Sequence, residues 1–381
     1  MDIVSFFSGA GGLDLGFSLA GHNIIWSNDF DKDAVASYNE AIGKYAKHES
    51  VLCDIIELLD CPKEKINDIL PDCDIIIGGF PCQGFTIANL DRNMTDPRNS
   101  LYKQLLKAIS VKQPPYFLLE NVKGLENIDD GKVLPVILSH LENCGTKDSM
   151  FFPSDDGCGY TVVYNVLNAY YFGVPQNRER VIILGIRNDL LANSPLAQNN
   201  ISSENPTNKK YDLRKRLSIP YTHSPDATEK WPYEHNEFIN NLYIDFISGN
   251  QQIHSFSKPT ILYKTTNMFD AIGDLPHDYS DKVPNHVGSL CKVKIKNVIG
   301  NRATDWQKRA PTIMGRGSGT GGPLIPPHPD QHRRLTVREV ARIQTFPDNL
   351  IFKGAKSACY RQIGNAVPVL MAYNIAKIFN Q

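Results

Sequence analysis

A single cysteine, Cys82, stands in the loop sequence GGFPCQGF at residues 78–85. The apolar run before it, residues 73–78, is typical of a buried strand, so the loop begins where that strand would end. A free thiol is only a few per cent thiolate at neutral pH, but a helix N-terminus after the strand can stabilise the anion. Pro81 would stiffen the approach, and the loop's three glycines would admit a substrate. Cys82 is therefore a candidate nucleophile.

Two further stretches could place charged groups beside this loop. In LLENVKG, residues 118–124, an apolar run delivers Glu120 to a strand end, where a carboxyl can donate or accept a proton. In GVPQNRERVIILG, residues 173–185, Arg178 and Arg180 are two apart and would face one side of a strand, which suits phosphate or carboxylate recognition. The plainer alternatives are a Glu that caps a helix or pairs with a surface Lys, and a solvated basic edge.

A glycine-rich turn follows the first predicted strand in FFSGAGGLDLGF, residues 6–17. Its glycines let the backbone approach a ligand, and the helix that follows offers free N–H groups. Asp29 ends the next strand about 20 residues on, where a carboxylate commonly accepts hydrogen bonds from ribose. Together they indicate a cofactor that contains a nucleoside. Asp54 follows near the position expected for a third strand end, but taken alone it is better explained as an ordinary helix N-cap.

The elements that must position these groups alternate along the first 190 residues, which predicts an α/β fold with a doubly wound sheet. After residue 191 the alternation is lost, and residues 191–330 are rich in Asn, Ser, Pro and isolated charges. Helical patterns return near the C-terminus, with a capping box at Thr336 and Glu339 and with Pro368 suited to a first helical turn. The predicted strands are Asp2–Phe7, Ile24–Asn28, Cys73–Gly78, Tyr116–Glu120, Tyr160–Asn168 and Arg180–Ile186. The predicted helices are Leu13–Leu19, Lys32–Asn39, Ser100–Ser110, Leu134–Asn143, Thr336–Thr345 and Val367–Phe379.

Charge is divided unevenly along the 381 residues. The net charge is −1, but residues 1–200 carry 16 basic and 26 acidic side chains, a net of −10, and residues 201–381 carry 24 and 15, a net of +9. A basic half is expected where a protein meets phosphate, although charge also varies along any chain. Basic residues gather at 209–216, in Lys209, Lys210, Arg214, Lys215 and Arg216, and alternate at Lys292, Lys294 and Lys296.

The eight cysteines lack CxxC spacing and the ten histidines do not cluster, so we expect no metal site. Neither a signal peptide nor a membrane span is apparent. Scattered cysteines without a secretory signal indicate a reducing, cytoplasmic location.

Taken in their order along the chain, these motifs resemble those of the cytosine-5 DNA methyltransferases over nearly the whole chain. The match continues through a variable region, RRLTVREVARIQTFP at residues 333–347 and QIGNAVP at residues 362–368. Any one motif could arise by chance, but six motifs and a variable region in the family's order are very specific. The first predicted strand starts directly after Met1, which resembles the bacterial members associated with restriction, although a solitary enzyme fits as well. The positions that depart from the common pattern are Asp29, Phe80, Thr86 and Asn99.

The resemblance implies a Rossmann-like sheet that binds S-adenosylmethionine, formed by residues 1–190 and 356–381. A second, smaller, irregular target-recognition domain would span residues 191–355, with its variable region at about 191–330. Cys82 would be the nucleophile, Glu120 would hold ring nitrogen 3 of a flipped cytosine, and Arg178 beside it, with Arg180, would complete the catalytic set. The implied cofactor residues are Phe7, Ala10, Gly11, Gly12, Asp29, Phe30, Asp54, Ile55, Pro81, Leu101, Asn365 and Val367.

The implied partner is double-stranded DNA, recognised by a monomer, with a cognate restriction endonuclease as a further partner. Three alternatives stay open at this point. The same chemistry could act on tRNA, since a threonine after the PCQ loop occurs in that branch. A catalytically silent DNA-binding regulator is disfavoured because the reacting groups are present. A dinucleotide-binding oxidoreductase is disfavoured because the turn lacks the GxGxxG spacing.

Overall fold

The computed structural model describes residues 1–46, 48–81, 97–202, 216–217, 219–250, 259–288, 293–296, 300–315, 325–330 and 333–380. Cys82 and all of the basic run at 209–216 except Arg216 lie outside these ranges. Within them, the centre of the fold is a seven-stranded mixed sheet in the order β3-β2-β1-β4-β5-β7-β6. The strands are β1 Asp2–Phe6, β2 Asn23–Asp29, β3 Val51–Leu52, β4 Ile75–Gly79, β5 Tyr116–Val122, β6 Tyr160–Asn168 and β7 Glu179–Arg187.

Strands β1 to β5 pair in parallel, and β7 runs antiparallel to both β5 and β6. The α/β class is confirmed, and all six predicted strands are present with ends that differ by at most two residues. The two-residue β3 was not among the predicted strands, because two residues are too few to show a periodicity. The parallel strands end at one edge of the sheet, and that edge is where ligands bind in open α/β folds.

Helices cover both faces of the sheet because strand side chains alternate between them. On one face Ile3, Ile75 and Leu118 pack into a core shared with α1 and α14; on the other, Val4 and Ile76 pack against α4, α5, α7 and α8. These helices are α1 Gly12–Leu19, α2 Lys32–Tyr38, α3 Lys44–Ala46, α4 Ile55–Leu59, α5 Lys63–Ile69, α7 Pro97–Lys112, α8 Val133–Glu142, α9 Pro195–Asn200, α10 His235–Ser248, α11 Met268–Ile272, α12 Val337–Ile343, α13 Lys356–Asn365 and α14 Val369–Ala376. Short 3-10 or π turns lie at Asn39–Gly43, Lys123–Gly131, Ala169–Phe172, Leu191–Asn193 and Lys377–Phe379.

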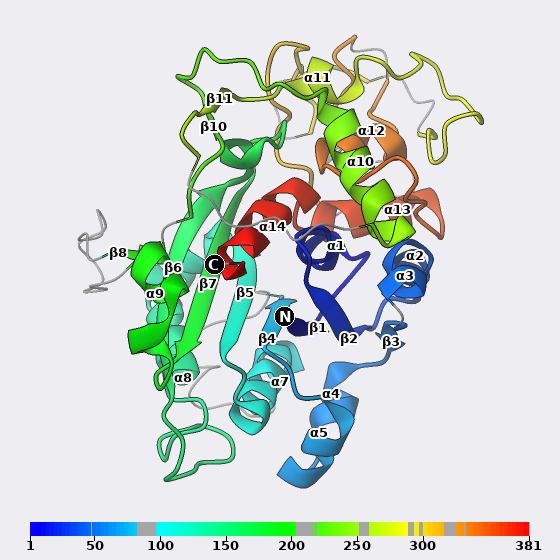
Figure 1. The fold of residues 1–381 in the computed structure, drawn as a ribbon. Coiled ribbons are helices and arrows are strands. Elements are labelled where there is room, and N and C mark those ends of the chain that lie inside the picture. The colour runs from blue at the N-terminus through cyan, green and yellow to red at the C-terminus, as the bar shows by residue number, and fades with distance from the viewer. Residues whose placement is uncertain are drawn as a thin grey trace.

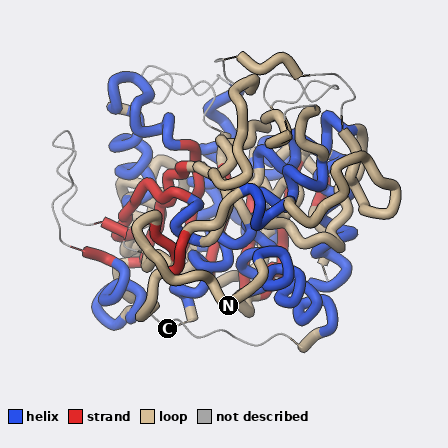
Figure 2. Tube along the Cα trace, turned by 90° about the horizontal axis from the view of Figure 1, so that it is seen from above, coloured by secondary structure: helices blue, strands red, loops and turns tan. Residues whose placement is uncertain are grey.

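The irregular second half gathers at one end of the molecule. Figure 1 shows α11, β10 (His223–Ser224) and β11 (Tyr263–Lys264) above the sheet, with α4 and α5 at the opposite end. Seen from above, this side is largely loops (Figure 2). The remaining strands, β8 (Ile201–Ser202) and β9 (Arg216–Leu217), form a separate antiparallel pair. The chain then returns through α13 and α14, and α14 packs against α1 in the core that both share.

The two helix starts predicted near the C-terminus are present in slightly different form. Thr336 accepts the Glu339 N–H while the Glu339 carboxylate accepts the Thr336 N–H, which is the predicted capping box at the start of α12. Pro368 occupies the N-cap of α14 rather than its first turn. The helix therefore begins two residues later than predicted.

Candidate active site

The glycine turn after β1 is shaped by left-handed backbone. Phe7, Gly9 and Gly11 have φ of 56°, 55° and 83°, a region that strongly favours glycine at the latter two positions. A Cβ placed on Gly9 would meet no described atom within 4 Å, so open space lies beside the turn. At Gly11, by contrast, a Cβ would stand 2.2 Å from the Ile42 side chain, which makes any larger residue there a steric clash. The neighbouring Ala10 is buried.

The Asp29 carboxylate, at the end of β2, fixes the turn. Its Oδ2 accepts the Gly9 N–H at 2.8 Å and its Oδ1 accepts the Asp31 N–H at 2.9 Å. Burial raises the pKa of Asp29 above its ordinary value, and the two amide donors oppose that shift. The next residue, Phe30, leaves 75% of its surface exposed, so a large aromatic face lies free at the mouth of the turn.

Asp54 and Ile55 lie at the start of α4. The Asp54 carboxylate accepts the Ile56 N–H at 2.8 Å and caps the helix, while Ile55 is buried. The helix-cap interpretation of Asp54 is therefore the one this structure contains. Leu101, on α7, is half-buried against the core on the far face of the sheet.

A segment near the C-terminus packs against the glycine turn. α13 ends at Asn365, which is exposed, and Val367 follows it. A Cβ on Gly12 would stand 2.4 Å from the Val367 carbonyl oxygen, so the two segments touch only because Gly12 has no side chain. One edge of the sheet thus carries open space, an exposed aromatic ring, a carboxylate and backbone amides. This donor set fits a nucleoside-containing cofactor with a positively charged centre.

A buried ion pair lies two strands away along the same edge. Glu120, near the end of β5, forms an ion pair with Arg180 on β7, in which Nε and Oε1 lie 2.7 Å apart and about 10% of each side chain is exposed. A Cβ on Gly79 would stand 3.0 Å from Glu120 Oε2, and Asn121 Nδ2 donates to the Phe80 carbonyl at 2.9 Å. The loop that leads to Cys82 therefore starts beside Glu120. Its last described residue, Pro81, is exposed.

Arg178 is held by backbone carbonyls of two other chain segments. Its fully buried guanidinium donates to three backbone carbonyls, those of Ile313 at 2.7 Å and of Gly364 and Ala366 at 2.9 Å. The ion pair with Glu120 is made by Arg180. Because β7 begins only at Glu179, strand alternation does not decide where Arg178 points.

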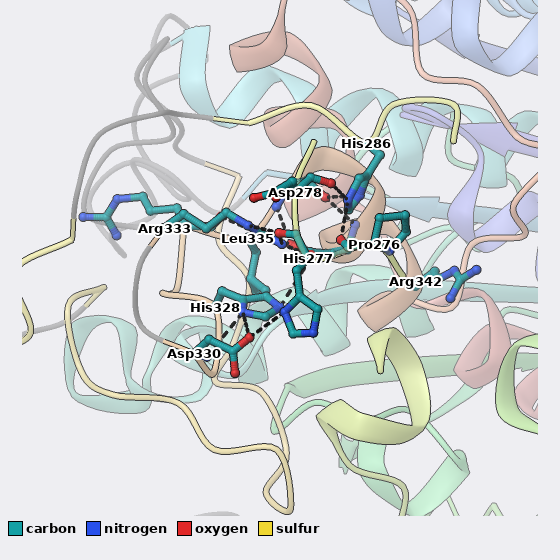
Figure 3. Close-up of polar contacts among 12 residues, drawn as sticks. Pro276, His277, Asp278, His286, His328, Asp330, Arg333, Leu335 and Arg342 are labelled. Carbon is teal, nitrogen blue, oxygen red and sulfur yellow. Dashed lines mark hydrogen bonds and ion pairs between the residues drawn. The ribbon is translucent and has the colours of Figure 1, made fainter. Parts of the chain in front are cut away.

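Residues between His277 and Glu339 form a polar cluster that the sequence analysis did not predict (Figure 3). The Asp330 carboxylate accepts from Trp306 Nε1 at 3.0 Å and lies 2.8 Å from His277 Nδ1. Arg333 makes a bidentate pair with Glu339, at 2.7 and 2.8 Å, and donates to the His277 carbonyl. The cluster joins segments about 60 residues apart in the chain, and no local pattern identifies such partners. The one signal in the sequence was the pair of opposite charges, Arg333 and Glu339, within the RRLTVRE stretch.

The chain matches the C-5 cytosine-specific DNA methylase family over residues 1–380. It belongs to the cytosine-5 DNA methyltransferase family. The methyltransferase is 33% identical over 393 residues to the Type II methyltransferase M.NgoFVII of Neisseria gonorrhoeae, an alignment that covers 99% of this chain and 87% of that one. It is 32% identical to M.MthTI of Methanothermobacter thermautotrophicus, with 99% and 96% covered. The S. pombe Dnmt2 methyltransferase structure superposes with a TM-score of 0.59 at 18% identity over 100% of this chain and 98% of that one, which shows the shared fold.

None of the methyltransferase's described helices is long and apolar enough to cross a membrane. No three His, Cys, Asp or Glu side chains in the described ranges stand close enough to hold a metal ion.

Proposed function

We propose that this DNA cytosine-5 methyltransferase transfers a methyl group from S-adenosylmethionine to carbon 5 of a cytosine that has been turned out of duplex DNA. The observation that carries the proposal is the buried Arg180–Glu120 pair beside the start of the Cys82 loop. On the parallel sheet, β4 separates the β1 turn from β5, so cofactor and base would approach the same edge. A base stacked in a duplex cannot reach that edge, and methyltransferases that act on bases extrude them.

The proposed chemistry begins at the Cys82 thiolate. Its addition to carbon 6 of cytosine forms a C–S bond and moves electron density to carbon 5, while Glu120 shares a proton with ring nitrogen 3. S-adenosylmethionine supplies an electrophilic methyl group on a sulfonium sulfur. Once carbon 5 carries the methyl, a base removes its hydrogen, the ring double bond re-forms and the thiolate leaves. In this scheme Arg180 keeps the Glu120 carboxyl in place.

The residues proposed to hold the donor are those of the turn and its surroundings. The open space beside Gly9 would admit the donor, and Gly11 and Gly12 would line the pocket with their backbone. Asp29 would accept from the ribose hydroxyls and the exposed Phe30 ring would stack on adenine. Phe7, Ala10, Ile55, Pro81, Leu101, Asn365 and Val367 complete the proposed pocket, and Asp54 would contact the adenine edge from its capping position.

Sequence recognition is assigned to the irregular region at about 191–330 within a small domain of residues 191–355. Its basic excess would bind phosphates, and side chains in its loops would read bases in the major groove. The relatives named Type II methyltransferases support duplex DNA as the substrate and a cognate endonuclease as a partner. We also propose that the enzyme is a monomer, acts in the cytoplasm and protects the cell's own DNA from that endonuclease.

The test uses duplex DNA in which the target cytosine, located first by bisulfite sequencing of DNA from expressing cells, is replaced by 5-fluorocytosine. Because fluorine cannot leave as a proton, wild-type enzyme with donor should form an adduct that survives a denaturing gel. Cys82→Ala should form none, whereas Cys158→Ala, which removes an exposed cysteine outside the site, should behave as wild type. The covalent assignment is wrong if Cys82→Ala still gives the shifted band. If the enzyme methylates tRNA but not duplex DNA, the proposed substrate is wrong and the substrate is tRNA.

A further inference from the structure

Three fully buried polar side chains lie between the parts of the site and take no part in the proposed chemistry. They are Gln176 and Arg178, in the segment before β7, and Gln344, just after α12. Gln176 Nε2 donates to Gln344 Oε1 at 2.9 Å, so two amides separated by 168 residues form one pair. A buried amide persists only where its donors and acceptors are satisfied, since each unsatisfied one costs about 1–3 kcal/mol.

The two amides satisfy their remaining groups on two other chain segments. Gln176 Oε1 accepts the Ile313 N–H at 2.9 Å, and Gln344 Nε2 donates to the Ile363 carbonyl at 2.7 Å. Arg178 bridges the same two segments, through the carbonyls of Ile313 and Gly364. We call Gln176, Arg178 and Gln344, with the backbone they bond, the polar junction.

Each segment that the polar junction joins leads to a different part of the site. The segment after Ile363 carries Asn365 and Val367, and the latter's carbonyl touches the glycine turn at Gly12. The segment of Ile313 lies within the proposed small domain, residues 191–355, and a Cβ on its Gly315 would stand 1.7 Å from Asn365 Oδ1.

The third segment continues from Arg178 directly to Arg180 and its pair with Glu120. A shift of any one segment must therefore break hydrogen bonds to the other two. Each amide needs a donor and an acceptor partner at the same time. The polar junction is therefore either fully hydrogen-bonded or broken, with few arrangements between these two states.

We propose that the Gln176–Gln344 pair is a positioning element that couples cofactor binding at residues 363–367 to DNA binding by the base pocket and the small domain. This inference rests on the proposed cofactor pocket. A ligand that orders one segment orders the others through the pair, so each ligand tightens the binding of the other by the same factor. Couplings of this kind typically amount to 5–150-fold in affinity, roughly, and we expect at least fivefold here.

The experiment measures the Kd of S-adenosylhomocysteine by calorimetry, with and without saturating mixed-sequence duplex DNA that lacks cytosine methylation. Wild type should bind at least fivefold more tightly with DNA. Gln344→Leu, which removes the pair at similar volume, should bring the ratio to within twofold of one. Gln176→Leu should do the same, and the double variant should add little more, because both remove one interaction. Either single variant suffices if the other does not fold.

The matched control is Gln362→Leu. Gln362 is also buried, and its amide accepts from Ser37 Oγ at 2.7 Å and donates to the Lys353 carbonyl at 2.9 Å, so its side-chain partners are not part of the polar junction. It should lose stability yet keep the wild-type ratio.

A wild-type ratio near one, an unchanged ratio in Gln344→Leu, or an equal loss in Gln362→Leu overturns the coupling while the cofactor assignment stands. Failure of the wild type to bind S-adenosylhomocysteine at all overturns the cofactor assignment, and the coupling with it.

Discussion

Replacing Arg178 by lysine separates two roles for this side chain. If it contacted the flipped base, as the motif resemblance implies, Arg178→Lys would slow methyl transfer and leave folding and cofactor binding nearly intact. The contacts to the Gly364 and Ala366 carbonyls, with the third to Ile313, indicate instead a structural anchor that ties the segment Gly364–Ala366 to Ile313. We therefore expect the variant to lose stability and to bind cofactor more weakly.

The size of the effect follows from the hydrogen-bond count. The guanidinium spreads its donors over three acceptors at 2.7–2.9 Å, whereas a lysine ammonium is a compact charge on a single atom. With one bond kept, two charge-assisted bonds of about 1.5–3 kcal/mol each are lost, so the unfolding free energy should fall by about 4 kcal/mol. Part of this free energy holds the Asn365 segment in the conformation that binds cofactor. If about 1.4 kcal/mol of it must be supplied on binding in the variant, the Kd of S-adenosylhomocysteine should rise about tenfold.

The chain offers a matched control in Arg338. This arginine is also fully buried, and it donates to the carbonyls of Pro284, Pro347 and Leu350 at 2.7–3.1 Å, none of which belongs to the segment Gly364–Ala366. Urea unfolding and calorimetric titration with S-adenosylhomocysteine should be run on both Lys variants. Both should lose similar stability, and only Arg178→Lys should bind more weakly.

Two results would refute the reasoning. Wild-type unfolding free energy in Arg178→Lys, with methyl transfer slowed, would mean that the side chain acts on the base and not on the carbonyls. Equal weakening of cofactor binding in Arg338→Lys would mean that affinity follows general stability.

Three further predictions concern the turn, the pH dependence and specificity. Gly12→Ala should bind S-adenosylhomocysteine more weakly and lose about 1–3 kcal/mol, because its Cβ would press on the Val367 carbonyl; unchanged calorimetry would contradict this. Burial lowers the pKa of His235 to about 3 from 6.5, so its contribution to stability is full above pH 6.5 and is lost as the pH falls. His235→Phe should therefore reduce the stability lost in urea unfolding between pH 7 and pH 5 by about 2 kcal/mol. Phe238→Leu, in the same aromatic cluster, should leave that difference unchanged, and equal pH dependence in all three proteins would rule out the burial effect. A chimaera with residues 191–330 of a relative should methylate the relative's target in bisulfite reads, and methylation at the original site would place recognition elsewhere.

The sheet and the glycine turn were predictable because their signals are local. Apolar runs bounded by glycine and polar residues located the strands, and β6, Tyr160–Asn168, matches its prediction residue for residue. The Asp29 position followed from the same logic, since the strand end and the turn are set by a few neighbouring residues. Long β-branched and aromatic stretches have few other low-energy choices once they are buried.

The partners of the two arginines were not predictable in the same way. Alternation would place Arg178 and Arg180 on one face only if both lay on the strand, but β7 begins at Glu179. Arg178 meets the carbonyls of Ile313 and Gly364, 135 and 186 residues further along the chain, and no local pattern predicts these partners. A motif therefore reports which residue types a site needs, while the assignment of each to chemistry or to scaffold depends on contacts made after folding.

A partial signal for the scaffold residues was nevertheless present. Gln344 follows Val337–Ile343, a helix whose residues are all buried, including Arg338 and Glu339. A polar side chain in such a setting must find partners, and its own helix can satisfy only a few of them. Buried amides and guanidiniums in a fully buried helix therefore predict hydrogen bonds to distant segments of the chain, even where the sequence does not identify those segments. In this methyltransferase that inference leads from one glutamine to the three segments on which cofactor, base and DNA are proposed to bind.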